Sequence, residues 1–339
     1  MLNAIAVMNT KGGVGKSTLV LALAETLSVF HGKNVLVIDG DAQSSVSSML
    51  MTIANLHKLQ SQGLTMVDFL VASVLNNQPA DWTRYVVRNV SDVDDARSVY
   101  LLPSDMQLTL FEREVSKENL HARMRAVIGS VLTDARRVFD VILIDCPPGL
   151  SVLTESWLRE ADYHISPTKA DYVSICGLEV FRRFKALNPE MGFARNMGVI
   201  VNMKDNQSPA DEDYHNWLRS DAENRCFTQA IPRLNSLQDA ARFLTIERSY
   251  AAKYPGAVGQ AMRALSAEVV ERMAQSEAQA VVPEPQPVTQ APIAQPPISQ
   301  ASAAPAKPAT TATATSPAPA AAAPVDAVPL QAEAAPRVA

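Results

Sequence analysis

The sequence predicts an α/β fold, with a single doubly wound, mostly parallel sheet that has helices on both faces. Short apolar runs recur along the chain with helical stretches between them, which is the pattern of buried strands joined by crossover helices. Carboxylates or glycine-rich turns follow several of these runs, and ligands bind at the carboxyl ends of such strands. The chain has 339 residues, of which 47% are hydrophobic, so it can bury the core of one full α/β domain.

The strands are expected, in chain order, at residues 4–8, 34–38, 98–102, 141–144, 163–167 and 198–202. The first strand precedes a glycine-rich loop and a helix that opens at residues 19–24, and residues 49–120 are predicted to be mostly helical apart from the strand within them. The last folded element is expected to be a helix over residues 257–274. Its apolar side chains recur at helical spacing, and we interpret them as core contacts rather than as a membrane anchor.

The loop after the first strand has the composition of a phosphate cradle. Its residues are Lys11, Gly12, Gly13, Val14, Gly15, Lys16, Ser17 and Thr18. The glycines let successive backbone N–H groups approach phosphate oxygens, and the following helix adds the partial positive charge of its N-terminus. Lys16 is predicted to neutralise the β- and γ-phosphates, and the Ser17 hydroxyl to bind Mg²⁺. The strand, loop and helix together predict a P-loop for a nucleoside triphosphate.

The start of the loop departs from the general P-loop pattern. Thr10 occupies its first position, and Lys11 follows. Lys11 cannot easily reach the γ-phosphate of its own loop, so we expect it to contact a phosphate that another subunit presents.

Carboxylates follow two of the predicted strands. Asp145 ends the strand at 141–144, the position from which an aspartate holds Mg²⁺, usually through water. Asp39 and Asp41 follow the strand at 34–38, and we expect Asp39 to support the metal shell while Asp41 orients the attacking water. The alternative is that these two carboxylates only cap a turn or a helix.

The composition changes near residue 276. From there onward the chain holds 13 of its 22 prolines among alanine, threonine, glutamine and valine, without glycine, cysteine or aromatic residues. Such a segment cannot bury enough apolar surface to offset the entropy of ordering it. We therefore predict a folded domain over residues 1–275 and a disordered Pro/Ala-rich tail over residues 276–339, with a tether or partner-binding arm as the alternative role of the tail.

The charge pattern leaves room for a local basic face. The formal net charge of −5 argues against a generally basic nucleic-acid-binding protein. Between residues 182 and 204, however, five basic residues accompany one acidic residue. Arg182, Arg183 and Lys185 are candidate DNA contacts, with Arg219 or Arg225 as further ones, and an ordinary solvated helix face is the alternative.

Cysteine usage and the chain start favour a cytoplasmic protein. Cys146, Cys176 and Cys226 are widely spaced and match no metal or redox pattern. The first strand begins almost at Met1, which leaves no room for a signal peptide, and no apolar run approaches about 18 residues. We expect neither secretion nor stable membrane insertion.

These residues resemble the ParA/MinD family of deviant Walker ATPases over about residues 1–275. Residues 11–18 resemble the family's P-loop with its signature lysine, and residues 39–43 resemble a motif that usually reads Asp-x-Asp-Pro-Gln, with Ala42 in the place of proline. The resemblance implies an ATP-sandwich homodimer in which Lys11 crosses to the partner's nucleotide, with Asp145 as the Walker B residue. Asn202 and Pro232 resemble the family's adenine-side positions.

Within the family, Thr10, Gln43 and the proline-rich chain end favour the short ParA type over MinD. That type implies a slow, partner-stimulated ATPase, nucleoid-associated when ATP-bound, that switches nonspecific DNA binding and segregates or positions a plasmid, chromosome or other cargo. A ParB-like or cargo-adaptor protein would stimulate it. We expect slow turnover because charge stabilisation would come from Lys11, Lys16 and Mg²⁺.

Two alternatives belong to other classes. A MinD-like or adaptor-type ATPase would regulate the placement of a membrane or surface apparatus and use ATP as a conformational timer. An electron-transfer ATPase similar to the nitrogenase iron protein would need a cysteine pair that bridges a cluster between subunits, and the three cysteines offer no such pair.

Overall fold

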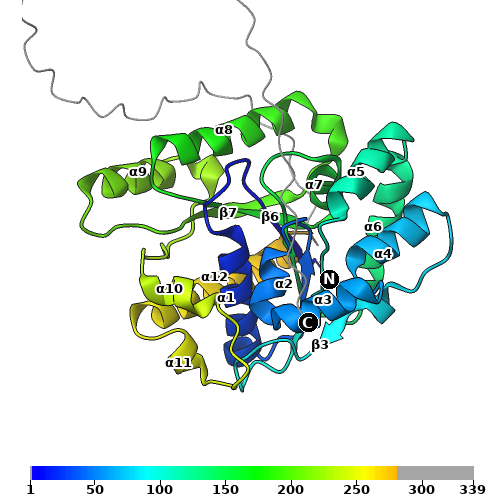
Figure 1. Ribbon diagram of the computed structural model, residues 1–339. Helices are drawn as coiled ribbons and strands as arrows, with labels where there is room; N and C mark the ends of the chain where they lie inside the picture. Colours follow the sequence, from blue (N-terminus) through cyan, green and yellow to red (C-terminus); the bar gives the residue numbers. More distant parts are fainter. Residues whose placement is uncertain (1, 281–339) are drawn as a thin grey trace, which may run out of the picture. The chain divides into compact units, whose positions relative to one another are not determined.

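A seven-stranded sheet forms the centre of the protein, as the computed structural model shows for residues 2–280 (Figure 1). The strand order is β3-β4-β2-β5-β1-β6-β7. The strands are β1 (Ala4–Val7), β2 (Val35–Asp39), β3 (Val87–Arg88), β4 (Val99–Leu102), β5 (Val141–Asp145), β6 (Tyr163–Thr168) and β7 (Arg195–Val201). All neighbours pair in parallel except β3, a two-residue antiparallel edge strand that the sequence pattern did not predict.

The helices alternate with the strands along the chain. They are α1 (Lys16–His31), α2 (Ser45–Leu50), α3 (Ile53–Ser61), α4 (Met66–Leu70), α5 (Leu108–Lys117), α6 (His121–Ala135), α7 (Val152–Glu160), α8 (Tyr172–Leu187), α9 (Pro209–Ser220), α10 (Asn235–Ala240), α11 (Tyr250–Lys253) and α12 (Ala257–Ala280). Short helical turns are η1 (Val71–Leu75), η2 (Trp82–Tyr85), η3 (Pro189–Met191) and η4 (Ala222–Asn224). The predicted mostly helical stretch at 49–120 therefore consists of short pieces, because loops and the β3 edge interrupt it.

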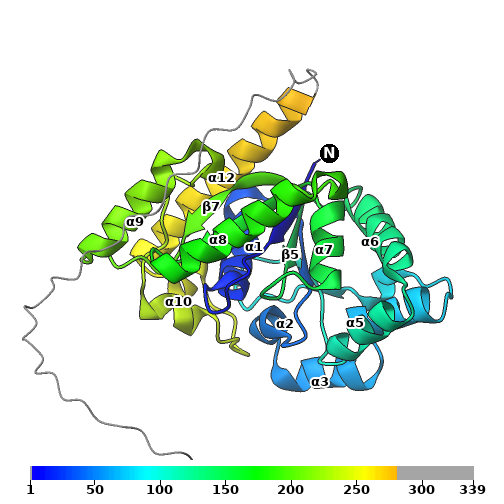
Figure 2. The same cartoon turned by 90° about the horizontal axis from the view of Figure 1, so that it is seen from above.

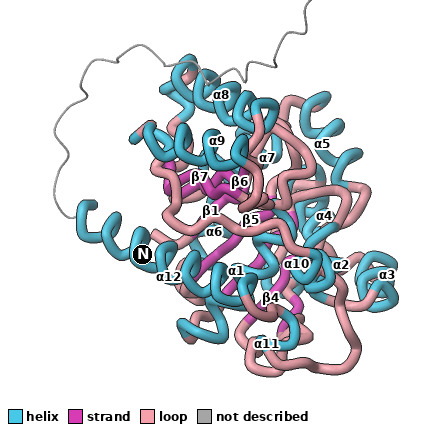
Figure 3. The backbone as a smooth tube through the Cα atoms, turned by 90° about the vertical axis from the view of Figure 1, so that its left-hand side faces the viewer, coloured by secondary structure: helices cyan, strands magenta, loops and turns pink. Residues whose placement is uncertain are grey.

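The two faces of the sheet have separate cores, which confirms the doubly wound α/β fold. Successive residues of a strand point to opposite faces, so Ile5 and Val7 pack with α1 and α12, whereas Ala4 and Ala6 pack with α4 to α7. Figure 2 shows β5 between α1 on one side and α6 and α7 on the other, and Figure 3 shows the molecule from the side of α1 and α12. Near β6 and β7, α8 and α9 close a third, smaller core, and Figure 2 shows these helices beside β7.

The end of the folded domain differs from the predicted boundary. Helix α12 continues to Ala280, five residues beyond residue 275, because residues 276–280 contain no proline and favour a helix, and the first proline after them is Pro283. The predicted disordered tail otherwise lies outside the described residues. Among the helices of the described range, none combines the length and the apolar character that a bilayer crossing needs.

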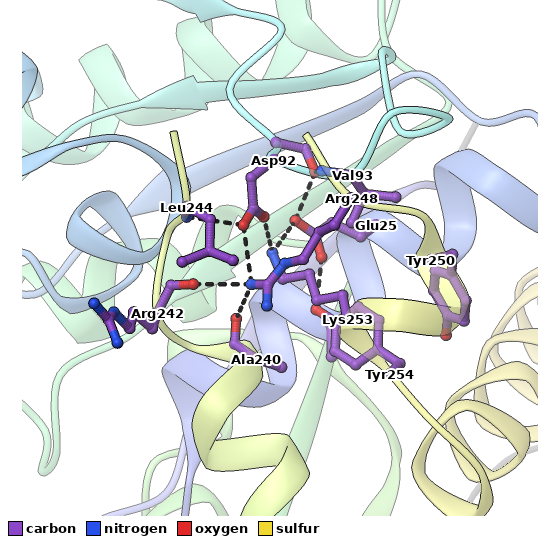
Figure 4. A network of polar contacts seen from close by, with 12 residues as sticks. Glu25, Asp92, Val93, Ala240, Arg242, Leu244, Arg248, Tyr250, Lys253 and Tyr254 are labelled. Atoms are coloured by element: carbon purple, nitrogen blue, oxygen red, sulfur yellow. Dashed lines mark hydrogen bonds and ion pairs between the residues drawn. The ribbon is translucent and has the colours of Figure 1, made fainter. Parts of the chain in front are cut away.

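A buried network of ion pairs and hydrogen bonds attaches the middle of α1 to residues 240–254 (Figure 4). Lys253 donates hydrogen bonds to Glu25 of α1 and to Asp92, and Asp92 also pairs with Arg248. Tyr254 donates to the other oxygen of Glu25 at 2.6 Å. The network holds the helix that follows the phosphate loop against residues 240–254.

Candidate nucleotide-binding site

The predicted phosphate loop connects β1 to α1 at the carboxyl edge of the sheet. Gly13 and Gly15 have positive φ angles of 73° and 82°, a conformation that glycine adopts without strain. A Cβ at Gly15 would lie 2.5 Å from Nδ2 of Asn202, so this position also requires close approach. Gly15 caps α1 without any side-chain hydrogen bond to the helix N-terminus, which leaves that end suited to an anion.

Lys16 lies almost buried behind the loop, at 7% exposure. Burial lowers the pKa of its ammonium, and the negative charges of Asp145 and Asp41 oppose that change. Lys11, by contrast, is exposed. The two lysines of the loop therefore face different surroundings, one within the site and one at the protein surface.

Asp39 and Asp145 lie opposite each other where β2 and β5 end in parallel register. Both are completely buried. Burial, followed by the charge of Asp39, raises the pKa of Asp145 well above its usual value, and the nearby Ser17 hydroxyl and Lys16 ammonium oppose the rise. Burial likewise raises the pKa of Asp39 to about 6. Two buried carboxylates at this edge call for a cation between or beside them.

The hydrogen bonds distinguish the two carboxylates. Oδ2 of Asp39 accepts from the backbone N–H and the hydroxyl of Ser47, at 2.9 and 2.5 Å, and its Oδ1 accepts from the N–H of Asp41. Within residues 2–280, neither oxygen of Asp145 has a hydrogen-bond partner. Asp145 is thus the carboxylate with free oxygens, and Asp39 is already held by Ser47.

These residues fit Mg²⁺, which prefers oxygen ligands and keeps several of its waters. The free oxygens of Asp145 and the Ser17 hydroxyl beside it supply such a donor set. In the described part of the chain, no three His, Cys, Asp or Glu side chains are arranged to hold a metal by themselves. A site completed by waters and phosphate oxygens agrees with that finding.

Asp41 lies at the opening of the site, where it is half-buried. Its Oδ1 accepts from the N–H of Gln43 at 2.9 Å, which forms a local turn. Gly40 before it permits β2 to end against β5, because a Cβ there would lie 2.9 Å from the carbonyl oxygen of Asp145. The sequence pattern did not predict the roles of Gly40 and Ser47, because their contacts with Asp145 and Asp39 form only in the folded chain.

Asn202 and Pro232, the residues predicted for the adenine side, lie beside the loop, and their contact with a nucleotide stays a prediction. Together with Gly13 and Thr18 they line a cavity of about 410 Å³. The Nδ2 of Asn202 donates to the backbone oxygen of Val14 at 2.8 Å, so this side chain also holds the loop.

The candidate DNA contacts on α8 do not form one solvent-facing basic set. Arg182 bonds Glu179, Asp221 and Glu223, with N···O distances of 2.7 to 3.2 Å. The Lys185 ammonium bonds the His164 ring and the backbone oxygen of Ala194, at 3.1 and 3.0 Å.

Acidic residues outside residues 182–204 therefore neutralise the charge of Arg182. The Lys185 side chain turns toward the interior. Of the three candidates only Arg183 is exposed.

Sequence and structure comparisons relate this chain to known proteins. A protein-family profile described as an AAA domain matches residues 2–191. The chain is 26% identical to the chromosome partitioning protein ParA of Caulobacter vibrioides over 285 residues, which span 82% of this chain and 98% of the relative. It is 30% identical to the chromosome-partitioning ATPase Soj of Thermus thermophilus over 274 residues, which span 79% of this chain and 96% of the relative.

A solved structure shares the fold. Cobyrinic acid a,c-diamide synthase from Mycobacterium smegmatis, with bound ADP and magnesium, matches with a TM-score of 0.62 at 22% identity, over 81% of this chain and 97% of that one. At this level of identity the likeness concerns the fold alone.

Proposed function

The chain belongs to the ParA/MinD family of P-loop ATPases, and on that premise we propose that it dimerises with ATP, switches its affinity for nonspecific DNA and thereby segregates or positions a cargo. The observation that carries the proposal is the phosphate loop with two lysines in different surroundings. Lys16 is buried beside Asp145, whose oxygens are free, whereas Lys11 is exposed.

Within one subunit, the loop N–H groups and Lys16 bind and orient the triphosphate. Ser17 and Asp145 would hold Mg²⁺, which when bound neutralises charge on the phosphate oxygens. Asp41, at the opening of the site, orients the attacking water and accepts its proton. Lys16, Asp39 and Asp145 are buried, so their charges act with little screening by solvent.

The position of Lys11 supports the proposed dimerisation. Lys11 is exposed, which supports the proposal that a second copy of the chain contacts its ammonium. A cation that meets the γ-phosphate of the partner completes that site only when two subunits meet, which couples ATP binding to dimerisation. Turnover is proposed to be slow, and a ParB-like or cargo-adaptor protein is proposed to accelerate it.

Exposed arginines and the names of the relatives support the proposed DNA binding. Arg183, Arg219 and Arg225 are exposed in one subunit, and a dimer doubles their number. The relatives in Caulobacter vibrioides and Thermus thermophilus are named as chromosome-partitioning proteins. We propose a cytoplasmic protein that associates with the nucleoid in its ATP-bound dimeric state.

Two loop variants test the proposal with one set of measurements. Lys16→Ala should abolish binding of a fluorescent ATP analogue, because it removes the cation buried in the site. Lys11→Ala should keep that binding and lose ATP-dependent dimerisation in sedimentation velocity runs. A Lys11→Ala protein that dimerises normally with ATP and Mg²⁺ contradicts the cross-subunit role.

Cosedimentation separates DNA from membrane as the surface that is bound. The unmodified protein with ATP and Mg²⁺ should cosediment with DNA-coated beads and not with anionic liposomes. Binding to liposomes alone would instead support a MinD-like or adaptor-type function.

A further inference from the structure

The residues around Lys11 are attached to β6 and α8 rather than to the helix that follows them. The Thr10 hydroxyl donates to the backbone oxygen of Gly177 at 2.8 Å, and Nδ2 of Asn9 donates to the backbone oxygen of Pro167 at 2.7 Å. Oδ1 of Asn9 accepts from the N–H of Lys11 at 2.8 Å. Asn9 and Thr10 therefore take their position from a part of the chain far away in sequence, and the Lys11 backbone is held in turn by Asn9.

Gly177 makes this attachment possible because it has no side chain. A Cβ at this position would lie 2.9 Å from Oδ1 of Asn9, 3.0 Å from Oγ1 of Thr10 and 3.4 Å from Cβ of Lys11. Asn9 cannot move aside easily, since it is 1% exposed and both ends of its amide are bonded. An added methyl group would displace the backbone that carries Lys11.

The place of Gly177 in the helix indicates what its small size is for. It lies inside α8 (Tyr172–Leu187), where glycine is less favourable than alanine. It is not among the residues with positive φ, so the backbone conformation does not require glycine. Close approach of the phosphate loop is the remaining physical reason for a glycine here.

We propose that Gly177 and the Thr10 hydroxyl are positioning residues for Lys11. They set the direction in which the exposed lysine leaves the loop, and they act only through it. The inference rests on the proposed function, because the position of Lys11 matters for a phosphate that a second subunit presents. Lys16 and the rest of the cradle lie outside these contacts, so binding of nucleotide by one subunit should not depend on them.

The test compares Gly177→Ala with Gly129→Ala. Gly129 also lies inside a helix, α6, and the group nearest to its added Cβ is the Glu160 carboxylate, the end of a partly exposed side chain that pairs with Arg125 and can shift toward solvent. Both variants gain the same intrinsic helix preference. Gly177→Ala should bind a fluorescent ATP analogue within about threefold of the unmodified protein, while its ATP-dependent dimer dissociation constant rises about tenfold or more. Gly129→Ala should change neither quantity.

Two further variants keep the inference falsifiable if Gly177→Ala does not fold. Thr10→Val removes the hydroxyl donor at nearly constant volume and should weaken the dimer about fivefold, whereas Thr10→Ser should restore it.

The possible failures are distinguishable. If the unmodified protein does not dimerise with ATP and Mg²⁺, the proposed function is wrong. If the unmodified protein dimerises, and Gly177→Ala and Thr10→Val dimerise as strongly as it does, only the positioning role is wrong. A loss in nucleotide affinity as large as the loss in dimerisation would also overturn that role, because it would indicate general damage to the loop.

Discussion

Replacement of Lys253 by methionine should strongly destabilise the fold. The Lys253 ammonium lies 2.7 Å from an oxygen of Glu25 and 2.5 Å from an oxygen of Asp92, and no side chain of the three is more than 1% exposed. Without the ammonium, Asp92 keeps its ion pair with Arg248 at 2.9 Å. Glu25 keeps only hydroxyl donors, from Ser91 and Tyr254. The loss therefore falls mainly on Glu25.

The expected magnitude follows from that geometry. Removal of one partner from a buried ion pair costs about 3–5 kcal/mol, because a buried charge is left uncompensated. Methionine fills most of the space of the lysine stem, so the loss of packing adds little. The free energy of unfolding of a domain is about 5–15 kcal/mol, and a urea midpoint should fall by roughly 1 M or more. Far-UV circular dichroism in a urea titration measures both quantities.

An exposed ion pair provides the matched control. Arg97 and Glu247 are 3.0 Å apart, with side chains 65% and 56% exposed, so Arg97→Met should cost less than about 1 kcal/mol. Adding Glu25→Gln to Lys253→Met should recover part of the loss, because it removes the orphaned charge. The reasoning is refuted if Lys253→Met costs no more than Arg97→Met.

Three more predictions concern the site and α8. Asp41→Ala should trap the ATP-bound dimer and reduce phosphate release about 100-fold, so rapid turnover in that variant would move the water-orienting role elsewhere. Arg183→Glu should weaken DNA cosedimentation at low salt, whereas unchanged binding would exclude this residue from the DNA face. Burial and the Lys185 ammonium hold the pKa of His164 well below the usual 6.5. Below pH 6.5 the His164 ring is therefore protonated in the unfolded chain but neutral in the native protein. The free energy of unfolding then decreases as the pH falls, by at most about 1.4 kcal/mol per pH unit. Between pH 7.5 and pH 5.5, the free energy of unfolding measured by urea titration should fall less for His164→Gln than for the unmodified protein. Equal falls in the two proteins would contradict this role of His164.

The fold and the phosphate loop could be predicted from sequence because their signals are local. Each of the six predicted strands appears, with boundaries shifted by a few residues, since a strand buried on both faces is a continuous apolar run. The residues of the loop are consecutive, so their spacing already contains their geometry. Asp39 and Asp145 could be predicted to meet because parallel strands place their carboxyl ends at one edge.

The basic face on α8 could not be judged in the same way. A count over residues 182–204 leaves out Glu179, Asp221 and Glu223, which are the acids that neutralise Arg182. It also cannot reveal that Lys185 turns toward the interior. Charge in sequence is a property of a segment, whereas charge at a surface depends on which side chains meet in space.

The sequence by itself determined that this chain has a phosphate loop with two lysines and carboxylates at the adjacent strand ends. The tertiary structure decided which of those groups remain free: Asp145 rather than Asp39, and Lys11 rather than Lys16 at the surface. It also decided that Gly177, more than 160 residues away, lies against the backbone of that loop. The physical reason is that burial and hydrogen bonding depend on distances between residues remote in the chain, and no local pattern contains those distances.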